Sequence, residues 1–127
     1  MIEIIKRYFQ YSDDRGSLEG LINFGEWKEI NLIKSSFDSV HGNHYHKHTT
    51  EVFIILDGEI RVVTQKVQNG KLVGNAVEEN IKSGDVFLIE PFINHIFFVK
   101  KDSRWINVLS EAIKKTHPDI HRIGVKD

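Results

Sequence analysis

The sequence predicts a small all-β protein, a single β-barrel or sandwich built from short strands. Three observations predict this class. Short runs rich in isoleucine, valine and phenylalanine recur along the chain, turn signals separate these runs, and a helical pattern is nearly absent. A chain of 127 residues suits one domain and is long enough to bury one core.

Turn signals set the limits of the predicted strands. Asp-Gly at 57–58 and Asn-Gly at 69–70 each stand between strand-like runs, and both dipeptides are strong β-hairpin signals. Further breaks are expected at 13–16, 37–43, 82–85 and 90–92. The strands predicted between the turns are 29–35, 51–56, 59–67, 85–90, 95–99 and 105–109.

The two ends of the chain lead to separate predictions. Residues 1–10 mix polar and apolar side chains, which suits an edge strand or a strand exchanged with a second copy in a homodimer. Residues 110–127 are expected to form a C-terminal tail that starts as one short helix or as irregular structure. His117 and His121 have a spacing that can bind metal on a helix, but Pro118 argues against a regular helix, so a solvated tail is expected.

Composition excludes several classes of function. The formal net charge is -1, so the chain has no basic footprint for nucleic acid or an anionic membrane. No apolar run approaches the ~20 residues that span a bilayer, and the N-terminal residues are too charged for a secretory signal, so a cytoplasmic location is expected. The chain has no cysteine, and any metal ion must therefore be held by imidazole and carboxylate groups.

The segment HGNHYHKHTTEVFI at 41–54 contains four of the seven histidines. Side chains on a strand alternate between its two faces, so His44 and His46 should point to the same side. Glu51 then opens an apolar strand face, where a lone buried carboxylate is costly. A bound cation would explain why a carboxylate stands there.

A third imidazole comes from a distant part of the chain. His95 follows a turn and starts an apolar strand, so it can complete a shell of three histidines and Glu51. Such a shell suits one divalent ion of manganese, iron, cobalt, nickel, copper or zinc, and it leaves coordination positions open. His48 has the same parity as the histidines at 44 and 46, but it sits where the chain must bend and is expected at the rim.

Two stretches resemble the motifs of the cupin superfamily. HYHKHTTEVFIILDG at 44–58 resembles the first motif and GDVFLIEPFINH at 84–95 the second, with all four ligand positions filled. Phe92 stands where the second turn usually has glycine. The resemblance implies a double-stranded β-helix, or jelly-roll, as a single domain over 1–127 with its metal-site core at 41–99.

A narrower resemblance concerns the substrate. DDRGSLEGL at 13–21 resembles the opening segment of cupins that modify nucleotide-linked keto-sugars, namely dTDP-sugar 3,4-ketoisomerases, 3,5-epimerases and the metal-binding cupin domains of capsular-sugar enzymes. HGNHYHKHTTE at 41–51 is similar to a segment of the last group. In the wider family the arginine of the opening segment contacts substrate phosphates, often across a dimer interface, and the resemblance gives this role to Arg15. Glu51 places the sequence nearer to the metal-binding cupins than to the metal-free ketoisomerases.

The resemblance implies a metal-dependent isomerase or epimerase of a nucleotide-linked keto-sugar, in cell-surface polysaccharide or deoxysugar biosynthesis. A divalent ion would polarise the carbonyl and hold the developing oxyanion while a side chain moves the proton, and His41 and Tyr45 are the candidates for that transfer. Two alternatives stay open. One is a non-haem metal dioxygenase of a small molecule, and the other is a cupin that binds a sugar or small molecule without turnover.

Overall fold

The computed structural model describes residues 1–125, which form nine strands and no helix. The strands are β1 (Glu3–Ile4), β2 (Phe9–Asp13), β3 (Gly16–Gly20), β4 (Glu29–Ser35), β5 (Val40–His44), β6 (Glu51–Gln68), β7 (Lys71–Lys82), β8 (Val86–Ile89) and β9 (Ile93–Leu109). Every strand pairing is antiparallel, which confirms the predicted all-β class. In this part of the chain no helix is long and apolar enough to cross a membrane.

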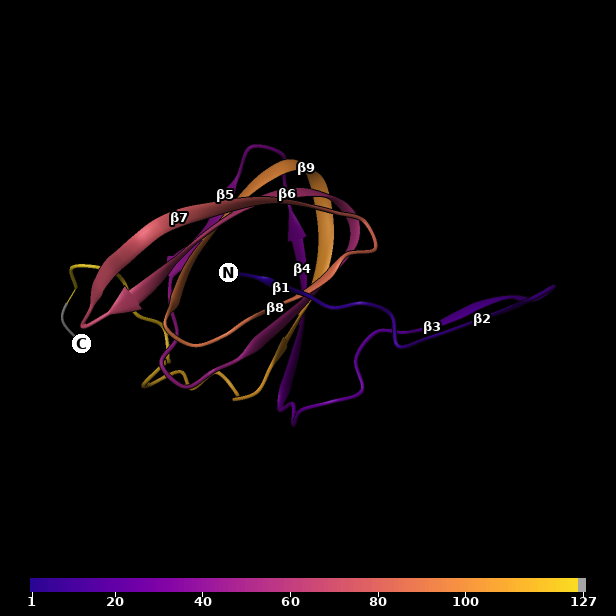
Figure 1. The fold of residues 1–127 in the computed structure, drawn as a ribbon, viewed down its shortest axis with the longest axis horizontal. Coiled ribbons are helices and arrows are strands. Elements are labelled where there is room, and N and C mark those ends of the chain that lie inside the picture. Colours follow the sequence, from indigo (N-terminus) through magenta and orange to yellow (C-terminus); the bar gives the residue numbers. More distant parts are fainter. Residues whose placement is uncertain (126–127) are drawn as a thin grey trace.

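The two longest strands, β6 and β9, form the frame of the barrel (Figure 1). They pair with each other along most of their lengths. The first part of β6 also pairs with β8 and its later part with β7, while β9 pairs first with β5 and then with β4. The seven-stranded sheet therefore has the order β1-β8-β6-β9-β4, with β5 on β9 and β7 on β6, and it curls around a buried interior.

β6 is one bent strand, so the predicted hairpin at 57–58 is wrong. The pairing of β6 with β9 shifts register on both sides of Asp57, and the chain bends through β-bulges without turning back. Gly58 permits this bend, because its φ is 111° and a Cβ atom there would lie 2.0 Å from Ser103 Oγ on β9. β9 likewise joins two strands that the sequence predicts separately.

The Asn-Gly hairpin prediction is confirmed. Asn69 and Gly70 connect β6 to β7, with φ values of 53° and 74° that suit a tight two-residue turn. The strand β7 itself is missing from the predicted set, because Gly74 and its polar neighbours have low strand preference and most of β7 is exposed. The break predicted at 37–43 is shorter than expected, since β5 already begins at Val40.

The barrel interior is apolar and aromatic. Phe53 on β6 stacks on Phe87 of β8 with ring centroids 5.1 Å apart, and its ring lies 5.5 Å from that of Trp105 on β9. Alternate residues of β6 and β8 face the other way, where the segment 21–27 packs against them. The main cluster also contains Ile55, Ile60, Val62, Ile81, Ile89 and Phe97.

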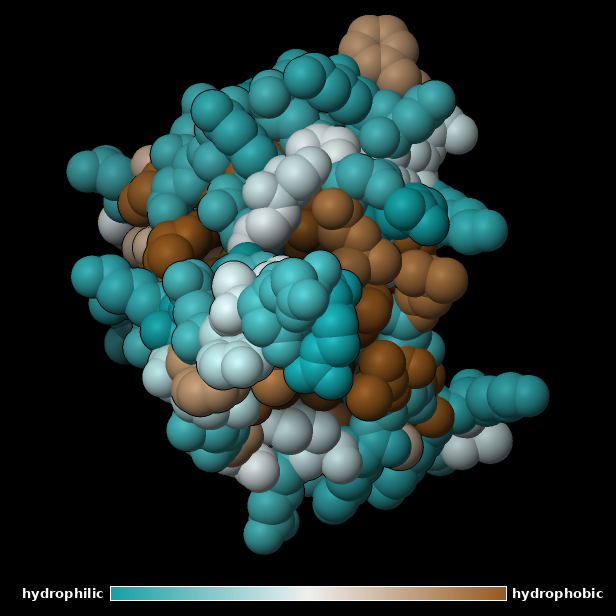
Figure 2. Space-filling model, turned by 90° about the vertical axis from the view of Figure 1, so that its right-hand side faces the viewer, coloured by the Kyte–Doolittle hydropathy of each residue, from teal (hydrophilic) through white to brown (hydrophobic). Residues whose placement is uncertain are grey.

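The N-terminal segment lies outside the barrel. β1 pairs with β8 of the same chain at the end of the sheet, as the edge-strand alternative predicts. β2 and β3 form a hairpin that projects away from the barrel (Figure 1). Viewed from that side, the surface shows apolar side chains gathered between hydrophilic ones (Figure 2). The exposed apolar residues of this hairpin region and of β4 are Tyr8, Phe9, Tyr11, Leu18, Ile30 and Leu32.

The C-terminal segment returns to the barrel. Residues 110–117 are irregular and form no helix, and His117 is exposed. Tyr45 and His121 exchange two backbone hydrogen bonds, of 2.9 and 3.0 Å, in an isolated bridge. This bridge lays residues 119–121 along the segment that carries two of the predicted metal ligands, so the prediction of a solvated tail is wrong for these residues.

Candidate metal centre and its cavity

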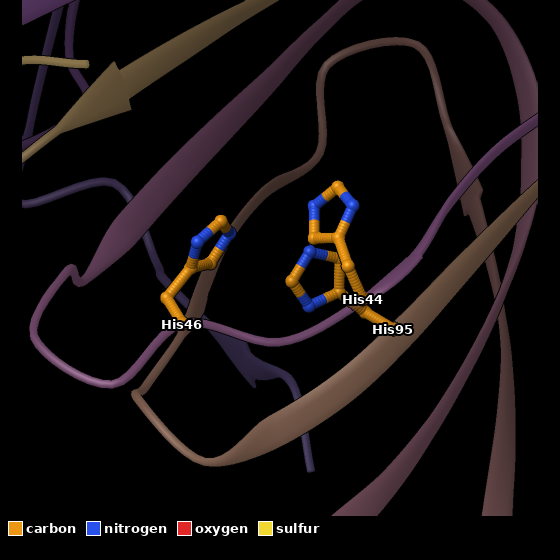
Figure 3. A group of neighbouring side chains, drawn as sticks. All are labelled: His44, His46 and His95. Atoms are coloured by element: carbon orange, nitrogen blue, oxygen red, sulfur yellow. The ribbon is translucent and has the colours of Figure 1, made fainter. Parts of the chain in front are cut away.

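Three imidazole rings converge inside the barrel (Figure 3). His44 ends β5, His46 follows two residues later, and His95 on β9 lies opposite His44 in the strand register. The ring centroids of His44 and His95 are 4.8 Å apart, those of His44 and His46 5.0 Å, and those of His46 and His95 5.3 Å. One ring nitrogen of each residue lies within 4.8 Å of the others.

Glu51 adds a carboxylate to this group from the start of β6. Its Oε1 lies 3.0 Å from His46 Nε2, and its Oε2 lies 3.7 Å from His95 Nε2. All three side chains are buried, yet His46 Nε2, His95 Nε2 and Glu51 Oε2 have no well-formed hydrogen bond within residues 1–125. Buried polar atoms without partners are rare and costly, and a cation between these atoms would satisfy them together.

Backbone carbonyl groups set the protonation of two of the rings. His46 Nδ1 lies 2.5 Å from the carbonyl oxygen of Asp119, and His95 Nδ1 lies 3.0 Å from that of Ile93. A carbonyl oxygen only accepts hydrogen bonds, so each Nδ1 must carry the proton that it donates. In the neutral rings the Nε2 atoms then present lone pairs toward Glu51, which is the form of histidine that binds a metal ion.

Two of the three rings have lowered pKa values, and contact with Glu51 raises the pKa of the third. Burial and the neighbouring histidines lower the pKa of His44 from 6.5 to about 3, and burial lowers the pKa of His95. Burial also opposes the charge on His46, but the adjacent Glu51 carboxylate outweighs burial and raises the His46 pKa. Burial opposes the charge on Glu51 as well, and the contact with His46 overcomes it and lowers the Glu51 pKa.

The donor set fits a divalent transition-metal ion. Two nitrogens bound at about 2.05 Å in tetrahedral geometry lie about 3.3 Å apart, so nitrogens within 4.8 Å of one another need only a small inward movement. Three neutral imidazoles and one carboxylate suit manganese, iron, cobalt, nickel, copper and zinc. The chain has no cysteine thiolate, and these nitrogen and oxygen donors do not select one of the six metal ions over the others.

The candidate ligands line a cavity of about 260 Å³. Much of its remaining wall is apolar and aromatic, with Phe53, Phe97 and Trp105 among the lining side chains. No lysine or arginine lines the cavity in the part of the chain that the structure describes. Ligand sites commonly enclose roughly 300–1,000 Å³, so this cavity is slightly smaller than a typical site and has room for a small group.

The structure brings one of the two candidate proton-transfer residues to the cavity. His41 on β5 lines it, with its ring 6.2 Å from the ring of Trp105. Tyr45 is buried elsewhere, against Phe92 and His121, and does not line the cavity. Strand alternation explains this position, because the residue between two inward-facing histidines must face outward.

Phe92 has a φ of 61°, the left-handed conformation that favours glycine, which explains why its place in the second motif usually holds glycine. Its N–H donates to the carbonyl oxygen of His46 over 2.7 Å. His48 is exposed and does not line the cavity, in keeping with a position at the rim. The turn around Phe92 therefore supports the ligand segment from outside the cavity.

Arg15 lies at the tip of the β2–β3 hairpin and does not line the cavity of its own chain. Its side chain is 84% exposed and pairs with Asp13 over 2.7 Å. The Arg15 pair lowers the pKa of the Asp13 carboxyl. A role for Arg15 at a cavity would therefore need the cavity of a second copy.

Asp119 is a site residue that sequence reasoning misses. Its carboxylate accepts hydrogen bonds from the backbone N–H groups of Lys47, His48 and Thr49 over 2.9, 2.8 and 3.0 Å, and from the Thr49 hydroxyl over 2.9 Å. Burial opposes the charge on Asp119, but these donors and His121 outweigh it and hold the pKa well below its usual range. No local pattern predicts these contacts, because the partners lie 70 to 72 residues earlier in the chain.

An antiparallel jelly-roll in which two separated motifs bring histidines together on the inner wall is the architecture of the cupins, and the fold implied by the sequence resemblance is confirmed. Within that class the chain belongs to the polysaccharide biosynthesis C-terminal domain family, whose model matches residues 11–120. A search of curated proteins finds no match.

Solved structures share this fold at low sequence identity. A 3,4-ketoisomerase from Helicobacter canadensis is 22% identical, with a TM-score of 0.75 over 95% of this chain and 90% of that one. The TDP-quinovose 3,4-ketoisomerase WlaRB from Campylobacter jejuni is 19% identical, with a TM-score of 0.76 over 95% and 92%. The capsular polysaccharide assembling protein CapF from Staphylococcus aureus is 21% identical, with a TM-score of 0.69 over 92% of this chain, which spans only 34% of that protein.

Proposed function

We propose that the protein is a metal-dependent isomerase or epimerase that acts on a nucleotide-linked keto-sugar for polysaccharide or deoxysugar biosynthesis. The observation that carries this proposal is the cluster of His44, His46, His95 and Glu51 on the wall of a cavity with room for a small group. The family description and the ketoisomerase and epimerase relatives of the same fold support the sugar substrate. A cytoplasmic location and a homodimer remain predictions from the sequence.

In the proposed reaction a proton leaves the carbon beside the substrate carbonyl, its bonding electrons pass to the carbonyl oxygen, and a proton returns to complete the rearrangement. A bound divalent ion supplies Lewis-acid stabilisation of the oxyanion. His41 is the residue of this chain that can move the proton, because it lines the cavity and is not one of the four candidate ligands.

Ser39 selects the tautomer of the neutral His41 ring. The Ser39 hydroxyl donates to the Ser36 carbonyl oxygen over 2.6 Å, so its oxygen can only accept from His41 Nε2, 3.2 Å away. The Nε2 atom then carries the ring proton, and Nδ1 holds the lone pair that can take a proton from a substrate.

The phosphates of the substrate need positive charge that the cavity of one chain lacks. The cavity is too small for a whole nucleotide sugar, so the nucleotide would lie at its mouth. Arg15 of a second copy would supply the missing charge, since the hairpin that carries it projects away from its own barrel (Figure 1). Apolar side chains around that hairpin give the second copy a surface to contact (Figure 2).

The test combines metal analysis with proton exchange. Purified protein is analysed for bound metal and is then incubated in D₂O with TDP-4-keto-6-deoxyglucose, the ligand found with a 3,4-ketoisomerase from Thermoanaerobacterium thermosaccharolyticum. Deuterium should enter the sugar beside its carbonyl, as seen by NMR, and chelation should stop this exchange. Saturable binding of nucleotide sugars with no deuterium uptake would instead identify a non-catalytic binding protein.

A non-haem dioxygenase is the second candidate, and the aromatic wall of Phe53, Phe97 and Trp105 favours it. Such a wall admits oxygen and an apolar substrate, and three histidines with one carboxylate suit iron. Metal content separates the two candidates. Sugar isomerisation supported by zinc, which has no redox chemistry, excludes the dioxygenase, whereas oxygen uptake that requires a redox-active metal excludes the isomerase.

A further inference from the structure

Two candidate ligands flank one short irregular segment, residues 47–50, which links His46 to Glu51. Within it, three successive backbone N–H groups, from Lys47 to Thr49, point to the carboxylate of one residue, Asp119. The Thr49 hydroxyl donates to the same carboxylate over 2.9 Å. Consecutive N–H groups that converge in this way form an anion-binding nest, here filled by a side chain of the chain itself.

Asp119 also contacts His46 through its backbone. Its carbonyl oxygen lies 2.5 Å from His46 Nδ1, on the ring edge opposite the Nε2 that faces Glu51. The neighbouring residue pair Tyr45 and His121 locks the two segments together by its backbone bridge. One residue of the C-terminal segment thus sets both the path of the loop and the orientation and protonation of the ring that precedes it.

We propose that Asp119 is a positioning residue of the metal centre, which holds His46 with Nε2 toward the cation and fixes the loop that delivers Glu51. The inference rests on the proposed metal site, and it gives the C-terminal segment a function there. Ligand-orienting partners of this kind typically contribute about 10–100-fold to metal affinity. In this proposal Asp119 acts through His46 and the loop, and it is not one of the four candidate ligands.

Asp119→Asn is the sharpest variant. The amide keeps the size of the carboxylate but replaces one acceptor oxygen with an NH₂ group, which then faces backbone N–H donors. Thr49→Val is a milder second variant, because it removes only the hydroxyl donor and keeps the shape. Asp57→Asn is the matched control, since Asp57 accepts two hydrogen bonds from Arg104 at an exposed position and does not line the cavity.

The experiment titrates each metal-free variant with zinc against a competing chelator and records the His46 ring by ¹⁵N NMR. We expect zinc to bind about 10–100-fold more weakly to Asp119→Asn, a few-fold more weakly to Thr49→Val, and unchanged to Asp57→Asn. In the metal-free protein the His46 Nδ1 signal should report its hydrogen bond in the wild type. Asp119→Asn keeps the backbone carbonyl, so this signature should weaken there only because the loss of the carboxylate contacts lets the carbonyl move away from the ring. Amide exchange at Lys47, His48 and Thr49 should accelerate in the same variant.

The outcomes separate this inference from the proposed function. If the wild type binds no zinc, cobalt or manganese, the metal proposal fails, and the NMR and exchange measurements still decide whether Asp119 positions His46. If the wild type binds zinc and both Asp119→Asn and Thr49→Val bind it equally well, with the His46 signals unchanged, the positioning role is overturned. If Asp119→Asn does not fold, the few-fold loss in Thr49→Val carries the test.

Discussion

The loop at 47–50, called the ligand loop here because it joins the candidate ligands His46 and Glu51, and the β2–β3 hairpin both lie outside the barrel sheet. They differ in the contacts that hold them in place. Four hydrogen bonds donated by the loop converge on the Asp119 carboxylate, and Tyr45 beside the loop is bridged to His121. The hairpin exposes Leu18 at 62% and projects into solvent in the single chain. Contacts within the chain fix the loop, whereas the hairpin exposes apolar side chains that a second copy could cover.

Among variants at and near the ligand loop, replacement of His46 should have the largest effect on metal binding. His46→Ala removes a candidate ligand and leaves the Asp119 carbonyl oxygen without its donor. If the proposed site binds metal, stoichiometry should fall from about one to near zero, with affinity reduced by more than about 100-fold. Metal analysis after dialysis measures this loss. His48→Ala and His117→Ala, both at exposed positions, should keep full occupancy. Full occupancy in a His44→Ala, His46→Ala double variant would overturn the ligand assignment.

The barrel core and the hairpin should respond very differently to the loss of one apolar side chain. Phe87 is fully buried and stacks on Phe53, so Phe87→Ala should lower the free energy of unfolding by about 3–5 kcal/mol. Leu18→Ala should change the stability of a monomer by less than about 0.5 kcal/mol. Urea denaturation at several protein concentrations sharpens the contrast. A Leu18→Ala effect that grows with protein concentration would show that the hairpin packs against a second copy.

The strands show how far local patterns predict this fold. β4 lies at the predicted residues and β8 within one residue of each predicted end, because alternating apolar side chains and flanking turn residues are local signals. The bend at Gly58 depends on close contact with Ser103, which is far away in the sequence, so the local Asp-Gly signal wrongly predicts a hairpin. β7 has weak strand preference and is specified mainly by its pairing with β6.

In the candidate site, too, local sequence patterns predict some residues and distant contacts determine the others. Alternation and motif spacing were enough to predict that His44, His46, Glu51 and His95 would meet. The same alternation rule places Tyr45 on the opposite face of the strand, outside the cavity. Asp119 could not be predicted, because its role depends on an irregular segment folding back over the ligand loop.

The metal-free centre should make stability depend on pH in two directions. The pKa of His44 is lowered from 6.5 to about 3, and the pKa of His95 is also lowered. Below about pH 6.5 these two histidines therefore bind protons in the unfolded chain and stay neutral in the folded chain. As a result, the free energy of unfolding falls as pH falls. The pKa of His46 is raised, so its contribution is fully present below pH 6.5 and is lost as pH rises through its folded pKa. The metal-free protein should therefore be most stable near neutral pH.

Urea denaturation between pH 5 and 9 in the presence of a chelator measures this profile. On the acid side, each histidine that stays neutral in the folded chain should add up to about 1.4 kcal/mol per pH unit to the slope of the free energy of unfolding against pH. His44→Ala should reduce the acid slope and leave the alkaline decline in place. A profile that is flat from pH 5 to 7 would contradict the buried neutral rings.

Arg15 gives the smallest expected effect on the folded chain and the most direct test of the hairpin. Its side chain is 84% exposed, so Arg15→Ala should leave the melting temperature of the barrel unchanged. If it contacts substrate phosphates, loss of this charged contact should weaken binding of TDP by about 10-fold or more, as measured by calorimetry. Asp14→Asn, at the adjacent turn position, is the control for a change of charge at the hairpin tip. Unchanged TDP affinity in Arg15→Ala would remove Arg15 from the site.

A mixing experiment then shows whether Arg15 acts on its own cavity or on that of a second copy. If the protein is a homodimer, Arg15→Ala and His41→Ala homodimers should each be nearly inactive, because one lacks the proposed phosphate contact and the other the proposed proton-transfer residue. In a mixed dimer, the cavity with an intact His41 receives Arg15 from the other subunit, so activity should reappear at one site of the two. Activity that stays at the level of the separate variants, in a mixture shown by mass spectrometry to contain mixed dimers, would mean that Arg15 does not act across the interface.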